Sequence, residues 1–399
     1  MVEIKSDNGI IPNRFSPQYP ADPIYFAGRT AETKTFKDTV RMCAKLTPPS
    51  PHNFAILGDW GMGKTSLLYE FEHIVLEELD ESIRCVSFYF PLSPNICKTW
   101  EKFSASLLFS MSTSLQPNKG LKKKFNEEAK KWAVELDLPL VKLKRNGEQD
   151  VVSYIELTEA LEKIWKDHLA PKGINIAFIL IDDFHLFPAT EEDIPFLNLR
   201  MTLEDLVKRR CNYSLVISSN STLFSSAVEV GDPINRFFSS HKYDLKNFSL
   251  EETKEAVKKR LLPDKEKSKF DDKVIETVYN LTGGHPFITM LTFYELFARA
   301  NVEIISMDFF ASHWPEIKKD IWSSQFMQVY KDVSFKEKKL LVRIAKAELI
   351  SNPVSVSDFG KDRTFFPSLE RRKLIVRTSR GKYKIFNPLF ADFLRQLDD

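Results

Sequence analysis

The chain has 399 residues, of which 43% are hydrophobic and 32 are Phe, so it is long enough for two or three domains with sizeable cores. Charged residues make up 28% and the formal net charge is +2, which excludes a polycationic chain and confines any basic surface to a local patch. The sequence has no signal-peptide core and no apolar run of the ~18–20 residues that a bilayer requires, so we expect a cytoplasmic protein without a membrane segment. The cysteines are scattered without a C-x-x-C pair, which argues against a zinc knuckle or a disulfide framework: Cys43, Cys85, Cys97 and Cys211.

Short apolar segments that alternate with helical patterns predict a parallel sheet. An extended, Pro- and Asn-rich arm over residues 1–23 precedes them. Because the segments between the strands carry helical apolar spacing, we expect helices on both faces of the sheet. The second and third strands are separated by more residues than one crossover helix requires, which predicts a helical insertion over about 105–170. The five expected strands cover residues 53–58, 83–90, 176–183, 213–220 and 242–248.

After residue 248 the strand patterns stop, so we expect the first domain to cover residues 1–248. A helical lid is expected over residues 249–320, with two of its helices broken at Gly283-Gly284. The tail over residues 331–399 shows helices, a hairpin pattern and a last helix. That order is typical of a winged helix.

A glycine-rich turn follows the first expected strand and opens a helix. Its sequence, GDWGMGKT, fits the pattern G-x-x-x-x-G-K-[ST] at every fixed position. The glycines let backbone N–H groups turn inward around phosphates, and the helix N-terminus adds a partial positive charge. Lys64 is expected to reach the β- and γ-phosphates of ATP, and the Thr65 hydroxyl is expected to bind Mg²⁺. The residues expected to hold the nucleotide here are Gly58, Asp59, Trp60, Gly61, Met62, Gly63, Lys64, Thr65 and Ser66.

Two adjacent carboxylates end the third expected strand, in the stretch FILIDD. Such neighbours repel each other unless they share a cation or a proton. We expect Asp182 to belong to the Mg²⁺ coordination shell. Asp183 is then placed to orient or deprotonate the water that attacks the γ-phosphate.

Three further polar groups are candidates for the same site. The fourth strand ends in Ser218, Ser219 and Asn220, where a polar side chain could sense the γ-phosphate, or Asn220 could be a helix-cap or turn residue. Arg236 could act as an arginine finger on the nucleotide of a neighbouring subunit, or it could be a surface residue after a Pro turn. The segment 283–286 places His285 and Pro286 at a helix junction near an adenine, or it is a plain helix break.

Together these residues resemble the AAA+ and STAND branches of P-loop ATPases, and in particular archaeal-type ATPases related to the Orc1/Cdc6 initiators. FAGRTAE looks like the F-x-G-R-x-x-E box that packs near the base, and GGHP resembles the G-x-P motif of STAND proteins. FILIDD is similar to the STAND form of the Mg²⁺ motif, and VISSN is similar to the sensor-1 strand of the initiators. The resemblance implies an α/β fold of the ASCE class of P-loop NTPases, with the sheet sandwiched by helices and followed by an α-helical lid and a C-terminal winged helix. It also implies ATP and Mg²⁺ as cofactors, with roles at the base or γ-phosphate for Arg29, His285, Pro286 and Asn220.

The sequence departs from that family in three ways. Lys64 and Asp182 lie 118 positions apart, which is longer than the family norm and leaves the insertion unexplained. Asp183 stands where AAA+ enzymes carry Glu, and because its side chain is one methylene shorter we expect slow hydrolysis, which suits a switch better than a motor. The lid shows no clear sensor-2 arginine, a role in which His285 could take part.

The expected winged helix is locally basic. Residues 331–399 contain 16 Lys and Arg against nine Asp and Glu, and the excess lies on the presumed third helix and wing. These parts meet the DNA backbone and groove in this fold, although a solvated basic face or docking on an acidic part of the chain fits the composition equally well. The candidate nucleic-acid-binding residues are Arg371, Arg372, Lys373, Arg377, Arg380 and Lys382, with Lys384 beside them.

Two functions follow from these patterns. The first is an ATPase that acts as a nucleotide-dependent switch and assembles on double-stranded DNA through its winged helix. The second is a STAND-like regulatory switch that recruits a protein partner or a second copy in the ATP state, without DNA. A small-molecule kinase is disfavoured because no second substrate pocket or lid arginine cluster is visible.

Overall fold

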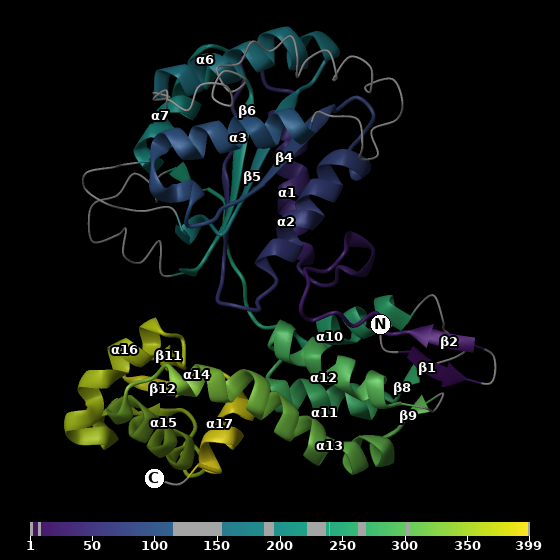
Figure 1. Ribbon diagram of the computed structural model, residues 1–399, viewed down its shortest axis with the longest axis vertical. Coiled ribbons are helices and arrows are strands. Elements are labelled where there is room, and N and C mark those ends of the chain that lie inside the picture. Colours follow the sequence, from purple (N-terminus) through teal and green to yellow (C-terminus); the bar gives the residue numbers. More distant parts are fainter. Residues whose placement is uncertain are drawn as a thin grey trace. The chain divides into compact units, whose positions relative to one another are not determined.

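The chain is described here by a computed structural model, and two compact units make it up (Figure 1). The sheet unit consists of residues 29–58 and 64–245. The helical unit consists of residues 1–28, 59–63 and 246–399. The structure describes residues 3–6, 9–114, 154–186, 195–221, 237–238, 240–261, 269–300 and 304–397.

The sheet unit contains five strands that all pair in parallel (Figure 1). Their order from one edge to the other is β4-β5-β6-β3-β7, so β6 separates the strand before the phosphate loop from the strand that ends at Asp182. The parallel sheet expected from the sequence is confirmed. The strands are β3 (Phe54–Leu57), β4 (Cys85–Pro91), β5 (Ile176–Asp182), β6 (Tyr213–Ser219) and β7 (Lys242–Asp244).

Helices cover both faces of this sheet. On one face, Phe36 of α1 stacks on Phe71 of α2 with ring centroids 3.9 Å apart, and it also meets Phe54 of β3. On the other face, α3, α6 and α7 share one buried core with the strands, to which Phe103 and Leu203 belong. Every residue of β5 and β6 is buried, which explains why these strands read as continuous apolar runs. The helices are α1 (Thr30–Cys43), α2 (Lys64–His73), α3 (Trp100–Ser114), α6 (Tyr154–Ile164) and α7 (Pro195–Lys208).

The expected helical insertion over about 105–170 is described at its two ends. The helix α3 supplies its start, and α6 supplies its end. Residues 115–153 lie outside the described residues.

The helical unit begins its lid part with α10, and α11 and α12 follow around a glycine break. Gly283 caps α11 in the left-handed conformation, with φ of +60°, and Pro286 takes the first position of α12. The lid helices are α10 (Leu250–Leu261), α11 (Asp272–Thr282), α12 (Pro286–Arg299), α13 (Met307–Ile321) and α14 (Met327–Lys331). The short strands of this unit are β1 (Glu3–Ser6) paired with β2 (Gly9–Pro12), and β8 (Lys269–Phe270) paired with β9 (Ile304–Ile305).

The C-terminal part has the helices and three-stranded sheet of a winged helix, as expected. Its strands follow the order β10-β12-β11, and the β11–β12 hairpin turns at Gly381 with φ of +70°. The elements are α15 (Phe335–Ala347), β10 (Val354–Ser355), α16 (Phe366–Arg371), β11 (Ile375–Ser379), β12 (Lys382–Ile385) and α17 (Pro388–Arg395).

The lid and the winged helix share one continuous hydrophobic core. Buried Asn387 links them, because its Nδ2 donates to the Thr282 carbonyl at 2.7 Å while its Oδ1 caps α17. Lys318 of α13 also pairs with Asp392 of α17 at 3.1 Å. The two parts are therefore packed as one body.

The N-terminal arm packs on the lid. Phe15 is buried, with ring centroids 5.8–5.9 Å from those of Phe270, Phe293 and Phe297. Arg260 of α10 donates to a backbone carbonyl further along the arm. The arm thus adds an aromatic side chain to the core of the helical unit.

Candidate nucleotide and magnesium site

The phosphate loop lies between β3 and α2, as the sequence predicts. Gly61 and Gly63 have φ of +77° and +84°, a region that only glycine adopts without strain. The helix α2 begins at Lys64, so Lys64, Thr65 and Ser66 form its first turn. The backbone amides and positive end of this helix suit a phosphate.

The Asp182 carboxylate accepts four hydrogen bonds at the end of β5. Its Oδ2 receives the hydroxyls of Thr65 at 2.8 Å and Tyr89 at 2.9 Å. Its Oδ1 receives the hydroxyl of Ser218 and the backbone N–H of Asp183 at 3.1 Å. Asp182 itself is only 5% exposed, so these donors replace the water that the charge would otherwise bind.

This donor set fits Mg²⁺. The ion prefers oxygen ligands and commonly uses one or two carboxylates together with substrate phosphates. Thr65 and Asp182, predicted as the metal residues, come from different elements and meet directly behind the first turn of α2. Among the described residues no cluster of three or more metal-ligating His, Cys, Asp or Glu occurs, so a metal here depends on hydroxyl and phosphate oxygens as well.

Asp183 has a left-handed backbone conformation directly after β5. Its φ is +55°, and its N–H donates to Ser218 Oγ at 3.0 Å as well as to Asp182. Its carboxylate is about half exposed, and His185 Nδ1 lies 3.9 Å from it. Asp183 is therefore held by its backbone and open to solvent at its carboxylate.

Tyr89 was not considered from the sequence, and Ser218 was considered only as one of three polar residues at the end of the fourth strand, of which Asn220 was selected. The register of the parallel sheet places them: Ile217 pairs with Ile181, so the next residue on each strand, Ser218 and Asp182, are neighbours. Pro91 of β4 pairs with Asp182, which brings Tyr89 to the same carboxylate. The strand order and register, which the sequence does not give, are what identify these two residues as neighbours of Asp182.

The other sequence-predicted residues of the sheet unit lie at its strand and helix ends. Asn220 follows β6 and is partly buried, one residue beyond the strand whose Ser218 contacts the carboxylate. Arg29 is buried at the N-cap of α1 with φ of +58°. Arg236 lies outside the described residues.

The middle of the phosphate loop packs on the first turn of α12 within the helical unit. Phe287 N–H donates to the Gly61 carbonyl at 3.1 Å, and the Trp60 and Phe287 rings have centroids 4.3 Å apart. The His285 ring hydrogen-bonds the Trp60 backbone, and burial lowers the pKa of His285 to about 4, so the imidazole is neutral at pH 7. His285 and Pro286, predicted near the base, thus border the phosphate-loop segment.

A side chain at Gly61 would not fit this packing. Its Cβ would lie 2.7 Å from Phe287 Cβ and 2.9 Å from His285 Cε1. Gly61 is a variable position of the phosphate-loop pattern, and the packing on α12 explains why a glycine occupies it here.

The predicted basic residues gather on α16 and the β11–β12 hairpin. Arg372 donates to the Asp332 carbonyl at 3.0 Å, and Arg377 donates to Ser379 O at 3.4 Å. Both acceptors are backbone carbonyls, so these two bonds neutralise no charge. Arg371, Arg372, Arg377 and Arg380 are exposed, and Lys373 and Lys382 are partly buried.

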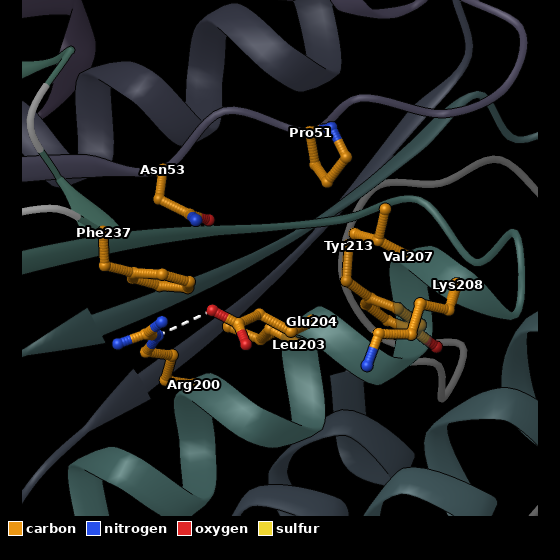
Figure 2. Close-up of a pocket in the computed structure, with 9 residues that line it drawn as sticks. All are labelled: Pro51, Asn53, Arg200, Leu203, Glu204, Val207, Lys208, Tyr213 and Phe237. Atoms are coloured by element: carbon orange, nitrogen blue, oxygen red, sulfur yellow. Dashed lines mark hydrogen bonds and ion pairs between the residues drawn. The ribbon is translucent and has the colours of Figure 1, made fainter. Parts of the chain in front are cut away.

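A separate cavity of about 490 Å³ lies in the sheet unit, beside α7 and at the opposite ends of the strands from Asp182 (Figure 2). Asn53 precedes β3 and Tyr213 begins β6, so the cavity adjoins the amino ends of these strands. Two of its lining charges, Arg200 and Glu204, pair with each other at 2.6 Å. The cavity is therefore distinct from the carboxylate cluster at the carboxyl ends.

No family model matches the sequence, and no curated protein matches it. Solved structures match nearly the whole chain. A Walker-type ATPase of Pyrococcus abyssi matches with 15% identity over 96% of this chain and 99% of its own, with a TM-score of 0.58. The ORC2 protein of Aeropyrum pernix in ADPNP–ADP complexes matches with 14% identity over 96% of this chain and 95% of its own, with a TM-score of 0.60.

These similarities concern the fold, since the identities are low. They confirm the expected likeness to archaeal Orc1/Cdc6-type ATPases at that level. In the part of the chain that the structure describes, no helix is both long and apolar enough to span a bilayer. The chain therefore shares the fold of archaeal Walker-type and ORC2 ATPases, with its carboxylate cluster behind the phosphate loop.

Proposed function

We propose that this protein binds ATP with Mg²⁺ and hydrolyses it slowly as a nucleotide-dependent conformational switch. The observation that carries the proposal is the Thr65–Asp182 hydrogen bond at the first turn of α2, with Asp183 beside it. A phosphate-binding turn alone would also suit other nucleotide-binding proteins. The paired hydroxyl and carboxylate are what metal-assisted phosphoryl transfer requires.

Each residue has a distinct role in this proposal. Lys64 binds the β- and γ-phosphates, and the amides of the loop and of the first turn of α2 surround them. Mg²⁺ held by Thr65 and Asp182 would neutralise the charge that develops on the phosphates. Asp183 accepts a proton from the attacking water at its exposed carboxylate. His285 is neutral and buried beside the loop, so in this proposal it packs against the loop and adds no positive charge to the site.

Nucleotide binding and hydrolysis can be separated experimentally. We expect Lys64→Ala to abolish binding of a fluorescent ATP analogue, and Asp183→Asn to keep binding while phosphate release stops. Lys102→Ala, an exposed lysine on α3, is the matched control and is expected to behave as wild type. Normal ATP hydrolysis by Lys64→Ala would refute the assignment of the site.

A second step of the proposal concerns DNA. We propose that the exposed arginines at the end of α16 and on the wing bind the backbone of duplex DNA in the ATP state. The supporting observation is that four exposed arginines lie within ten positions of one another there, Arg371, Arg372, Arg377 and Arg380. Backbone contacts of this kind depend on salt and carry no sequence preference of their own.

Duplex binding measured by fluorescence anisotropy at 50 and 200 mM salt tests this step. We expect Arg371→Glu/Arg372→Glu to weaken ATP-dependent binding and to lower the slope of log K against log salt by about 2. Lys34→Glu/Lys102→Glu makes the same change of charge at exposed positions of the sheet unit and is expected to bind as wild type.

If the wild-type protein binds no duplex in either nucleotide state, the DNA step is wrong. Light scattering with ATP and with ADP then distinguishes the alternative, a switch that recruits a protein partner or a second copy. That alternative requires a nucleotide-dependent change of mass without DNA.

A further inference from the structure

The Tyr89 hydroxyl is the most unusual of the four donors to Asp182. The other three come from the phosphate-loop helix, from β6 beside β5, and from the backbone of Asp183. Tyr89 comes from the edge strand β4 and reaches Oδ2 at 2.9 Å. Tyr89 is therefore the one tyrosine among these four donors, and its hydroxyl reaches the carboxylate from β4, the strand beside β5.

We propose that the Tyr89 hydroxyl competes with Mg²⁺-bound water for the Asp182 carboxylate, and so weakens metal binding at this site. This inference rests on the proposed function, since it assumes that Mg²⁺ binds at Thr65 and Asp182. It assigns to Tyr89 a regulatory role in metal affinity. Tyr89 is not a ligand in this proposal.

The hydrogen-bonding capacity of the carboxylate supports the competition. Each carboxylate oxygen has two lone-pair sites, and two protein donors point at each oxygen of Asp182. A metal-bound water needs one of these sites, so one donor has to give way. Burial of the carboxylate limits the approach of water from other directions.

Tyr89 is the donor most free to leave. The Asp183 N–H is backbone, and Ser218 Oγ is fixed by its second bond to that same N–H. Thr65 can keep its bond to Asp182 while a lone pair of its oxygen faces a metal. Tyr89 is only partly buried, so its hydroxyl can exchange Asp182 for water while its ring keeps the contact with Tyr69 of α2, with centroids 5.2 Å apart.

The test is the Mg²⁺ dependence of nucleotide binding in Tyr89→Phe. This variant keeps the edge-to-face ring contact with Tyr69 and removes only the hydroxyl. The Mg²⁺ affinity of the protein–nucleotide complex is measured by titration calorimetry, and nucleotide binding is measured in EDTA. We expect Mg²⁺ to bind roughly tenfold more tightly than in wild type, which corresponds to loss of one competing hydrogen bond to a charged group. Binding in EDTA is expected to be unchanged.

Tyr243→Phe is the matched control. Tyr243 lies on β7 of the same sheet, and its buried hydroxyl has no hydrogen-bond partner among the residues that the structure describes. Removing it leaves the Asp182 cluster intact, so we expect wild-type Mg²⁺ affinity. Thermal melts of both variants show whether either change acts through stability.

Unchanged or weaker Mg²⁺ binding in Tyr89→Phe would overturn the proposal. Weaker binding would mean that Tyr89 positions Asp182 for the metal. Failure of the proposed function is recognised separately, because wild type itself would then bind no nucleotide or show no Mg²⁺ dependence.

Discussion

Replacing Ser218 with Ala should impair hydrolysis without preventing nucleotide binding. The Ser218 hydroxyl is fully buried, donates to Asp182 Oδ1 and accepts the Asp183 N–H at 3.0 Å. A hydrogen bond to a charged group contributes about 1.5–3 kcal/mol, and because Asp182 keeps three other donors we expect a loss of about 2 kcal/mol in the free energy of unfolding. The larger effect is on Asp183, whose left-handed backbone loses one of its two acceptors.

Hydrolysis is sensitive to such a shift. Misplacing a catalytic group by about 1 Å can lower the rate about a hundredfold, so we expect kcat to fall about ten- to a hundredfold in Ser218→Ala. Phosphate release under saturating ATP gives kcat, a fluorescent nucleotide gives the affinity, and urea denaturation gives the stability.

Ser214→Ala is the matched control on the same strand. Ser214 is also buried, but its hydroxyl donates to the neutral His52 carbonyl. We expect a loss of about 1 kcal/mol in stability and an unchanged kcat. The reasoning fails if Ser218→Ala hydrolyses ATP as wild type does, or if Ser214→Ala slows it to the same degree.

Three further predictions concern the helical unit. Because burial lowers the pKa of His285 to about 4, the unfolded chain binds a proton below about pH 6.5 that the folded chain does not, so stability should fall by up to about 3 kcal/mol between pH 6.5 and 4. Urea denaturation at pH 7.5 and 5 checks this, and His285→Gln should flatten the slope. Gly61→Ala should destabilise the unit more than Gly360→Ala, by about 1–3 kcal/mol in urea midpoints, because both have positive φ but only Gly61 meets other atoms. Asn387→Ala should cost about 1–3 kcal/mol in the same assay, since it removes a helix cap and leaves the Thr282 carbonyl with the His285 N–H as its remaining donor, whereas Asn387→Ser should recover the cap alone.

The order and kind of elements in the sheet unit could be predicted from the sequence. Uniformly buried strands such as β5 and β6 leave continuous apolar runs, and the glycine pattern marks the turn from β3 into α2. The residues of each segment are therefore enough to predict these strands and this turn. The packing of Phe15 against the lid could not be predicted, because its aromatic partners lie more than 250 positions away.

The candidate site could be predicted only where its residues are adjacent in the sequence. Lys64 and Thr65 follow from one motif, and Asp182 and Asp183 from another. Ser218 and Tyr89 belong to other strands, and only the strand order and register show that they reach Asp182. From the sequence, Asn220, which follows β6, was therefore preferred to Ser218, which lies within β6 and contacts Asp182.

The phosphate loop is connected along the chain to both units. Residues 59–63 belong to the helical unit, whereas Gly58 before them and Lys64 after them belong to the sheet unit. The loop is therefore attached to β3 and α2 at its ends and hydrogen-bonded to the first turn of α12 at Gly61. The Gly61 carbonyl that Phe287 binds belongs to the same peptide as the Met62 N–H, which donates to the Asp59 carbonyl at 3.4 Å within the loop. Under the proposed function, a phosphate bound by the other amides of this loop is expected to restrain the Gly61 peptide as well, and so to stabilise the packing of the loop on the first turn of α12.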